Sequence, residues 1–97
     1  MEKSKYYYNC KFVYLLNASA ITLGSRIFYS FPEDKVPENV KIHEHTHLRQ
    51  YEEYGVFKFL FLYIKHYIKG RLNGLSHWES YYQIPFEVEA FNSEKNI

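Results

Sequence analysis

Residues 37–55 read PENVKIHEHTHLRQYEEYG, and this stretch organises the rest of the chain. Pro37 and Glu38 suit the first turn of a helix, because proline fits the first helical position and an acidic side chain interacts favourably with the helix dipole. A glycine such as Gly55 commonly follows the last residue of a helix. The stretch therefore predicts a helix from about Pro37 to Tyr54 that ends at Gly55.

The middle of this predicted helix carries a His-Glu-x-x-His motif at residues 43–47. On a helix, His43 and His47 lie one turn apart on one face, where two imidazoles can bind the same zinc ion. Glu44 lies beside them and can act as the general base for a metal-activated water. His45 is two steps from each flanking histidine and points away. The motif predicts a zinc hydrolase, with a peptidase as the first choice.

A strand is the alternative for the motif. A period of two would align His43, His45 and His47 on one face. His45 and His47, followed by Glu52, would then be similar to a cupin-type metal site. The charged residues around the motif, together with the start and end described above, favour the helix.

The third metal ligand must come from another segment, because a catalytic zinc site has three protein ligands and one open position. The strongest source is residues 85–90, which read PFEVEA at the predicted start of a later helix. Glu87 and Glu89 lie two steps apart there, so they cannot both face the metal. The residues alone leave both carboxylates as candidates.

Taken together, these segments resemble the gluzincins, zinc peptidases whose third ligand is a glutamate on a later helix. The sequence HEHTHLRQ at 43–50 and the sequence YYQIPFEVEA at 81–90 carry the resemblance, and ITLGSRI at 21–27 is similar to the strand before the motif helix. The chain is similar to short metallopeptidase-like proteins of bacterial and phage genomes. The resemblance covers most of the chain and implies a small zincin-like domain.

The resemblance also implies which carboxylate binds the metal. In many gluzincins the third ligand opens an E-x-x-A-D pattern. Glu87 fits its first place, so Glu87 is the implied ligand and Glu89 its neighbour, with the reverse as the alternative. Phe91 stands where the pattern has an aspartate that orients a zinc histidine, and such outer partners matter for metal affinity. Glu94 is the candidate substitute.

The implied cofactor is Zn2+, and the implied reaction is peptide-bond hydrolysis through a metal-activated water. Glu44 would move the proton from that water to the leaving amine. A second donor usually stabilises the oxyanion. Tyr81 is the first candidate for that role, with Tyr82 and His77 as alternatives. The strands within residues 21–31 could hold an extended peptide by strand addition.

The predicted fold is α+β in a single domain over residues 1–97. We expect strands at residues 11–16 and 20–31, because their side chains are β-branched or aromatic. Turns at residues 17–19 and at Gly24-Ser25 should separate them. The strands would form an N-terminal β-hairpin or a short antiparallel sheet, followed by three helices that carry the metal site.

The second of these three helices should cover residues 56–69 and end at Gly70, and the third should cover residues 86–93. A short helical turn is expected at residues 78–82. Residues 32–35 should form an exposed loop.

The composition argues against some functions. A net charge of +1 gives no basis for binding nucleic acid, which needs a clustered basic surface. Cys10 is the single cysteine, so the chain can form no internal disulfide and no cysteine-based zinc site. Aromatic residues make up 21% of the chain. We expect them to serve packing, with a binding face as the alternative.

Two segments raise the question of membranes. Residues 1–20 lack the long apolar run of a signal peptide, because Asn9 and Lys11 interrupt it. Residues 56–68 are too short to span a bilayer, so a packed core helix is expected there, with an interfacial membrane helix as the alternative. A peptide or protein substrate is the expected partner, together with assembly into oligomers or a larger complex. The expected location is the cytoplasm or a virion.

A second class of function fits the same residues. A zincin-like protein could bind metal in a structural or interaction role, for example in a phage particle, without catalysis. The short chain, Phe91 in place of the aspartate and the many tyrosines favour this alternative. Glu44 favours the enzyme, because a structural zinc site needs no base.

Overall fold

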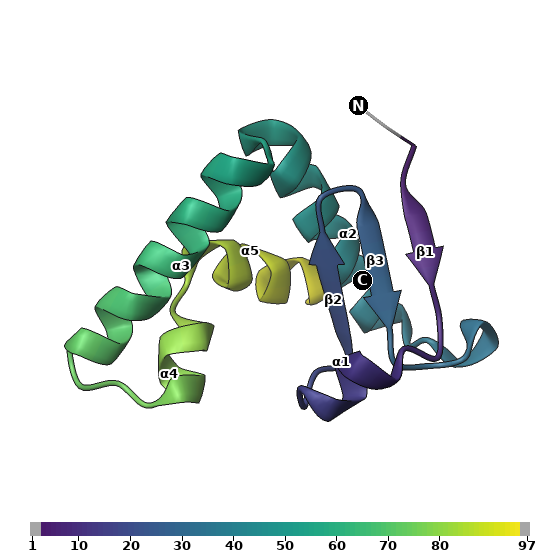
Figure 1. The fold of residues 1–97 in the computed structure, drawn as a ribbon, viewed down its shortest axis with the longest axis horizontal. Coiled ribbons are helices and arrows are strands. Elements are labelled where there is room, and N and C mark those ends of the chain that lie inside the picture. Colours follow the sequence, from purple (N-terminus) through teal and green to yellow (C-terminus); the bar gives the residue numbers. More distant parts are fainter. Residues whose placement is uncertain (1–2, 96–97) are drawn as a thin grey trace.

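The computed structural model describes residues 3–95 and has an α+β fold (Figure 1). The first two residues of the 1–20 segment lie outside this range. Within it the elements are β1 (Lys5–Tyr7), α1 (Lys11–Leu15), β2 (Ala20–Leu23), β3 (Arg26–Tyr29), the 3-10 helix η1 (Glu33–Lys35), α2 (Glu38–Tyr54), α3 (Val56–Leu72), α4 (His77–Tyr82) and α5 (Pro85–Glu94). The α+β class is confirmed, and the three helices expected after the hairpin are α2, α3 and α5, while α1 is a further helix that was not expected.

The sheet has the strand order β1-β3-β2. β2 and β3 form the predicted antiparallel hairpin, and Ile21 lies opposite Phe28. Gly24 begins their two-residue turn with φ of 61°, a conformation that glycine adopts at little cost. β1 pairs in parallel with β3, so the prediction of a purely antiparallel sheet is wrong. β1 has no clear signal in the sequence and was not predicted, since its three residues are all exposed and show no alternation.

The predicted strand at residues 11–16 is also wrong, because Lys11–Leu15 form the helix α1. β1 and β2 lie on opposite sides of β3, so the chain must cross the end of β3 between them. α1 makes this crossing and buries only Val13. The side chains of this segment favour a strand only where they can pack on a sheet, and the position of the segment beside the end of β3 does not allow that packing.

The motif helix is confirmed, since α2 runs from Glu38 to Tyr54. A single residue, Gly55, connects it to α3 and has φ of 83°. α2 buries Leu48 and Tyr51 and, in addition, five polar side chains: His43, Glu44, Thr46, His47 and Gln50.

The helix α3 does not end at Gly70, contrary to the prediction, but continues to Leu72. Gly70 lies where α4 packs on α3, and a Cβ atom there would be 2.9 Å from the Ser80 Oγ. The glycine therefore permits close helix packing instead of ending the helix. The expected helical turn at 78–82 is α4, which begins with a capping box between Ser76 and Glu79.

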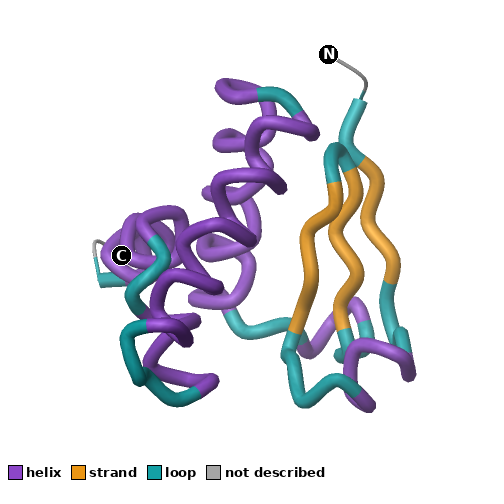
Figure 2. Tube along the Cα trace, turned by 60° about the vertical axis from the view of Figure 1, so that its left-hand side comes forward, coloured by secondary structure: helices purple, strands orange, loops and turns teal. Residues whose placement is uncertain are grey.

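The sheet forms one layer, and α2, α3, α4 and α5 lie on one side of it (Figure 2). One core cluster joins the sheet to α2, and a second joins α2, α3 and α5. The first contains Ile27, Tyr29, Val36 and Leu48, and the second contains Tyr51, Phe59, Ile84 and Phe86. Among residues 3–95, none of the helices combines the length and apolar character needed to cross a bilayer.

Candidate metal centre

α2 and α5 together bring two imidazoles and one carboxylate to a single point. The Nε2 atom of His43 lies 2.8 Å from the Glu87 Oε1, and the Nε2 atom of His47 lies 3.1 Å from the same oxygen. All three side chains are buried, and one potential ligand atom from each lies within 4.8 Å of the others. The spacing of four residues on α2 explains the facing imidazoles. Glu87 reaches them because it lies in the first turn of α5.

The Nδ1 atom of each imidazole faces an acceptor. The Nδ1 of His43 lies 2.6 Å from the Glu94 Oε2, and the Nδ1 of His47 lies 2.8 Å from the Gln50 Oε1. The Gln50 amide nitrogen donates to the Phe86 carbonyl and to the Glu89 carboxylate, which leaves its oxygen for His47. Both Nδ1 atoms therefore act as donors, and both Nε2 atoms of neutral rings carry a lone pair.

This pattern fits a cation between the three side chains. Two Nε2 lone pairs turned toward one carboxylate oxygen repel each other and that oxygen, unless protons or a positive ion lie between them. Two histidines and one glutamate are also the ligand set of known catalytic zinc sites. The outer partners Glu94 and Gln50 match the usual arrangement in which a ligating histidine donates its other N–H to an oxygen.

Without a metal, protons hold the cluster together. Burial lowers the pKa of His43 and His47, but the hydrogen bonds and negative charge of Glu87 outweigh burial and raise both pKa values. Burial also acts to raise the pKa of Glu87, and the two imidazoles overcome this and hold it below its usual value. A cation and a pair of protons would thus stabilise the same geometry.

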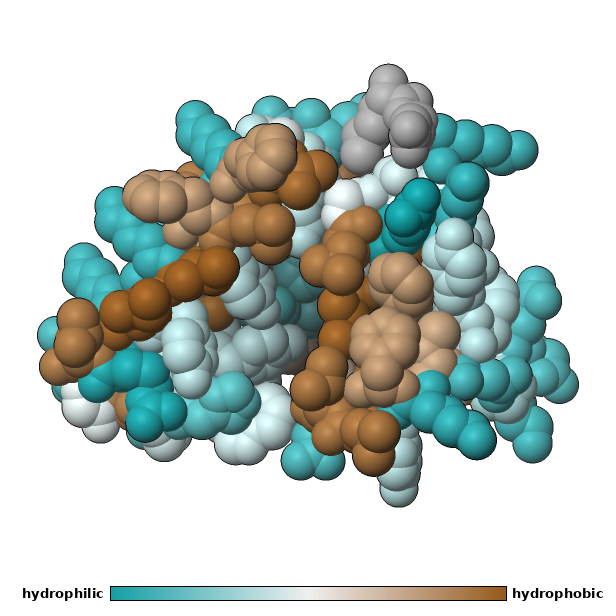
Figure 3. Space-filling model, viewed as in Figure 1, coloured by the Kyte–Doolittle hydropathy of each residue, from teal (hydrophilic) through white to brown (hydrophobic). Residues whose placement is uncertain are grey.

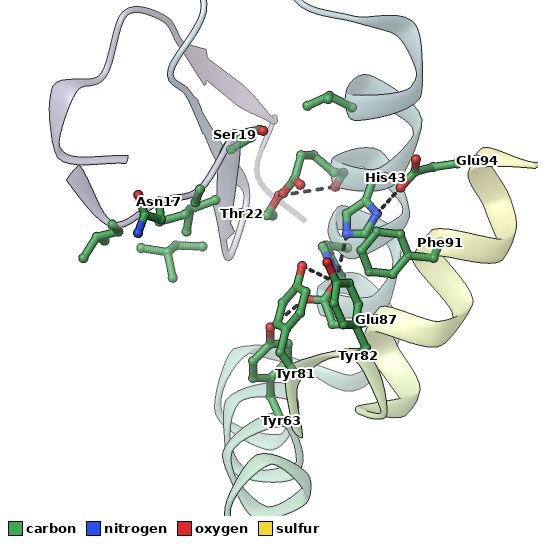
Figure 4. A pocket seen from close by; sticks show the side chains of 18 of the residues that line it. Asn17, Ser19, Thr22, His43, Tyr63, Tyr81, Tyr82, Glu87, Phe91 and Glu94 are labelled. Atoms are coloured by element: carbon green, nitrogen blue, oxygen red, sulfur yellow. Dashed lines mark hydrogen bonds and ion pairs between the residues drawn. The ribbon is translucent and has the colours of Figure 1, made fainter. Parts of the chain in front are cut away.

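Two tyrosines complete the surroundings of Glu87 (Figure 4). The Tyr63 hydroxyl donates to Oε2 at 2.6 Å, and the Tyr81 hydroxyl donates to Oε1 at 3.1 Å. Burial, followed by the charge of Glu87, raises the pKa of both hydroxyls, so they remain protonated donors. Tyr63 therefore fixes the carboxylate from the side away from the imidazoles.

Glu44 lies beside the cluster and lines the same cavity. Its Oε1 accepts a hydrogen bond of 2.8 Å from the Thr22 hydroxyl on β2. Burial raises the pKa of Glu44 above its ordinary value, while the nearby His47 and the Thr22 hydroxyl oppose that shift. A buried carboxylate with a raised pKa is a stronger proton acceptor than an exposed one, which suits a general base.

The cavity beside these residues has a volume of about 590 Å³. In Figure 3, apolar side chains form one ridge along α3 and another along β2 and α1, and the surface is hollowed between them. β2 contributes Ala20, Ile21 and Leu23, α3 contributes Leu60, and α4 contributes Trp78 and Tyr82. A largely apolar cleft with a few polar groups at its base is typical of a ligand site.

The structure brings together His43, His47 and Glu87, the three residues predicted as ligands, while their role in binding metal stays a prediction. Glu89 points elsewhere, and its carboxylate pairs with Arg49 at 2.8 Å. Glu94, the candidate substitute for the aspartate that orients a zinc histidine, contacts the Nδ1 of His43.

Phe91, in the place of the expected aspartate, packs its ring against His43 with centroids 4.5 Å apart. Among the three candidate donors, Tyr81 contacts the cluster directly. Tyr82 lines the cavity. The His77 Nδ1 pairs with the Tyr67 hydroxyl at 2.9 Å. His45 is exposed on the opposite side of α2, as expected for the helix.

Three further residues belong to the site and were not predicted from the sequence: Thr22, Gln50 and Tyr63. Gln50 follows His47 by three residues on α2, and this spacing could have indicated the contact. Thr22 and Tyr63 approach from β2 and α3, so only the tertiary packing shows their role.

Comparisons with protein-family models, with curated proteins and with solved structures find no match to this chain.

Proposed function

We propose that this protein is a small zinc-dependent peptidase of the gluzincin type with a zincin-like fold. The observation that carries the proposal is the convergence of His43, His47 and Glu87, whose nitrogen and oxygen atoms lie within 4.8 Å of one another beside the carboxylate of Glu44. Two imidazoles, one ligating carboxylate and one further carboxylate are the parts that metal-assisted peptide hydrolysis requires.

His43, His47 and Glu87 would hold the zinc ion, and zinc bound there would polarise a substrate carbonyl and lower the pKa of a water molecule to about 7. Glu44, oriented by Thr22, accepts a proton from the attacking water and later donates it to the leaving amine. Tyr81 contributes a hydroxyl to the developing oxyanion, since it is the donor among the three candidates that contacts the cluster.

The substrate is proposed to be an extended peptide along β2. This strand lies at the edge of the sheet within residues 3–95, and its side chains line the cavity. An edge strand offers main-chain groups to a peptide that adds to the sheet. The Thr22 carbonyl already accepts from the Tyr51 hydroxyl at 3.1 Å, so pairing would use the other main-chain groups of β2 that point away from β3.

The test is the substitution Glu44→Gln, measured by zinc content and by cleavage of a mixture of unstructured peptides. We expect the variant to retain zinc and to lose hydrolysis by at least about a hundredfold, because the amide cannot accept the proton. Glu53→Gln, at an exposed position near the end of α2, is the matched control and should retain both properties. Hydrolysis at the wild-type rate in Glu44→Gln would rule out this mechanism.

The second candidate function is metal binding without catalysis, as in a structural or interaction protein. The large exposed apolar side chains of the surface favour it, for example Phe57 and Leu72. It predicts that the wild-type protein binds zinc but cleaves none of the peptides. The two candidates therefore differ in the activity of the wild-type protein and not in its zinc content.

A further inference from the structure

The outward face of α3 carries an uninterrupted apolar stripe. We define the outer stripe by its members, with their exposed fractions: Phe57 (89%), Phe61 (66%), Ile64 (53%), Ile68 (48%) and Leu72 (82%). Steps of three and four residues align them along the helix over about 22 Å. A patch of this kind on a protein surface usually marks an interaction site.

The outer stripe is separate from the face by which α3 joins the fold. Phe59 is 3% exposed and packs in the core, and Gly70 contacts α4. Tyr63 reaches inward to Glu87. The helix is therefore apolar on two opposite sides, although a helix at the surface of a globular protein needs one apolar face. The packing of the described residues accounts for the inner side and leaves the outer side about half to nine-tenths exposed.

The charges along α3 are all positive. Lys58, Lys65 and Lys69 follow one flank of the outer stripe, Arg71 follows the other, and residues 56–72 contain no aspartate or glutamate. All four cationic side chains are exposed. Long basic side chains can keep their charged ends at a polar boundary while their carbon chains lie against apolar surface.

We propose that α3 docks on the surface of a membrane that contains anionic lipids, with the outer stripe inserted among the acyl chains. Apolar side chains on one face and lysines beside them are the features of a helix that lies in the interface plane. The lysines would contact anionic headgroups. A second copy of this chain fits less well, because two such helices would bring lysine against lysine with no acidic partner on either.

The same docking explains why α3 is apolar toward the outside as well as toward the protein, although it is not long and apolar enough to cross a bilayer. The inner side of the helix helps to form the cavity through Leu60 and Tyr63. Attachment of the outer side would hold the cleft beside the membrane surface. This inference does not depend on the proposed peptidase activity.

The experiment is flotation of the full chain with vesicles of phosphatidylcholine alone or of phosphatidylcholine with phosphatidylserine. We expect binding to the anionic vesicles, weaker binding to the neutral ones, and a loss of binding as salt is raised. Phe57→Ser with Phe61→Ser should lower the partition coefficient at least about tenfold, because two inserted rings are lost. Lys65→Gln with Lys69→Gln should lower it by roughly tenfold or more on anionic vesicles alone.

The matched control is Tyr14→Ser with Leu15→Ser on α1, which removes two apolar side chains that are 74% and 78% exposed. This control should bind vesicles like the wild type, and all variants should keep the wild-type circular dichroism. No preference of the wild type for anionic vesicles would overturn the proposal, and so would an equal loss of binding in the control. A dimer that disappears in Phe57→Ser with Phe61→Ser, without vesicle binding, would assign the outer stripe to self-association instead.

Discussion

α2 and α3 each contain 17 residues and meet at Gly55, but they distribute their side chains in opposite ways. Besides Leu48 and Tyr51, α2 turns histidine, glutamate, threonine and glutamine side chains inward, where they are buried. α3 buries only Phe59 and Gly70, and it exposes the five apolar residues of the outer stripe. In most globular proteins the buried side chains are apolar and large apolar stripes are covered.

The difference shows where each helix finds its interactions. The buried polar groups of α2 have partners within the protein, since His43, Glu44, His47 and Gln50 all make hydrogen bonds to side chains of other segments or of α2 itself. The apolar side chains of the outer stripe of α3 stay largely exposed. We infer that α2 serves chemistry inside the molecule, whereas α3 serves contact with something outside it.

The largest expected effect is a loss of zinc binding that occurs on the inward face of α2 and not on its exposed face. Replacing His47 with alanine should abolish the binding of about one zinc ion per chain, because one of three ligands is lost. His45→Ala is the matched control, since His45 is exposed and bonds through its ring to Lys41 and Tyr6. Metal analysis of the purified variants measures both. Equal zinc contents in the two variants would contradict the assignment of the inner face as the metal site.

The next effect compares the two sides of α3. Phe59→Ala should lower the free energy of unfolding by about 3–5 kcal/mol, because the ring packs against Tyr51 and Phe86 in the core. Phe57→Ala should change it by less than about 0.5 kcal/mol, since Phe57 is exposed. Urea unfolding of both variants measures the difference. A large loss of stability in Phe57→Ala would mean that the outer stripe is part of the folding core.

A smaller effect concerns the outer partners of the α2 ligands. Glu94→Gln should weaken zinc binding about 10- to 100-fold, because Glu94 accepts from the Nδ1 of His43. Competition with a zinc chelator of known affinity measures the change. Glu53→Gln, an exposed position at the end of α2, is the control and should bind zinc like the wild type. If both variants have the same affinity, the Glu94 contact is not used in the metal-bound state.

The smallest effect is a change in the pH dependence of stability. In the metal-free protein, Glu87 raises the pKa of His43 and His47 above 6.5. The protonated imidazoles then stabilise the fold fully below that value, and the contribution is lost as the pH rises through the raised pKa values. We expect the free energy of unfolding in chelator to fall by on the order of 1 kcal/mol between about pH 6 and about pH 8.

Zinc should reverse this trend, because metal binding releases protons and is favoured as the pH rises. Urea unfolding with chelator and with zinc, at both pH values, measures how the free energy of unfolding changes with pH in each condition. The same falling slope in both conditions would mean that zinc does not occupy the imidazole cluster. Variants of the outer stripe should leave the pH dependence of the free energy of unfolding unchanged in both conditions.

The sequence predicted α2 well because its signals are local. The Pro37-Glu38 start, the Gly55 end and the four-residue spacing of His43 and His47 all depend on residues close together in the chain. The pairing of β2 with β3 was also predictable, since Gly24-Ser25 is a strong turn signal.

Other features depend on contacts between distant segments. Residues 11–16 have strand-like side chains, but Lys11–Leu15 form the helix α1, because the chain crosses the end of the sheet there. Gly70 has the local appearance of a helix end, and only the packing of Ser80 against it explains why α3 continues. Thr22 and Tyr63 join the site for the same kind of reason, since no local pattern links either residue to α2 or α5.

The single residue between α2 and α3 has a consequence for the width of the cleft. Gly55 gives the chain no slack, so its two backbone torsions set the angle at which α3 leaves α2. A side chain at this position would meet no neighbouring atom within 4 Å, yet φ of 83° is costly for any other residue. A residue that relaxed this torsion would swing one whole wall of the cavity and carry Tyr63 away from Glu87. The width of the cavity thus depends on the backbone torsions of Gly55, which lies at one end of α3.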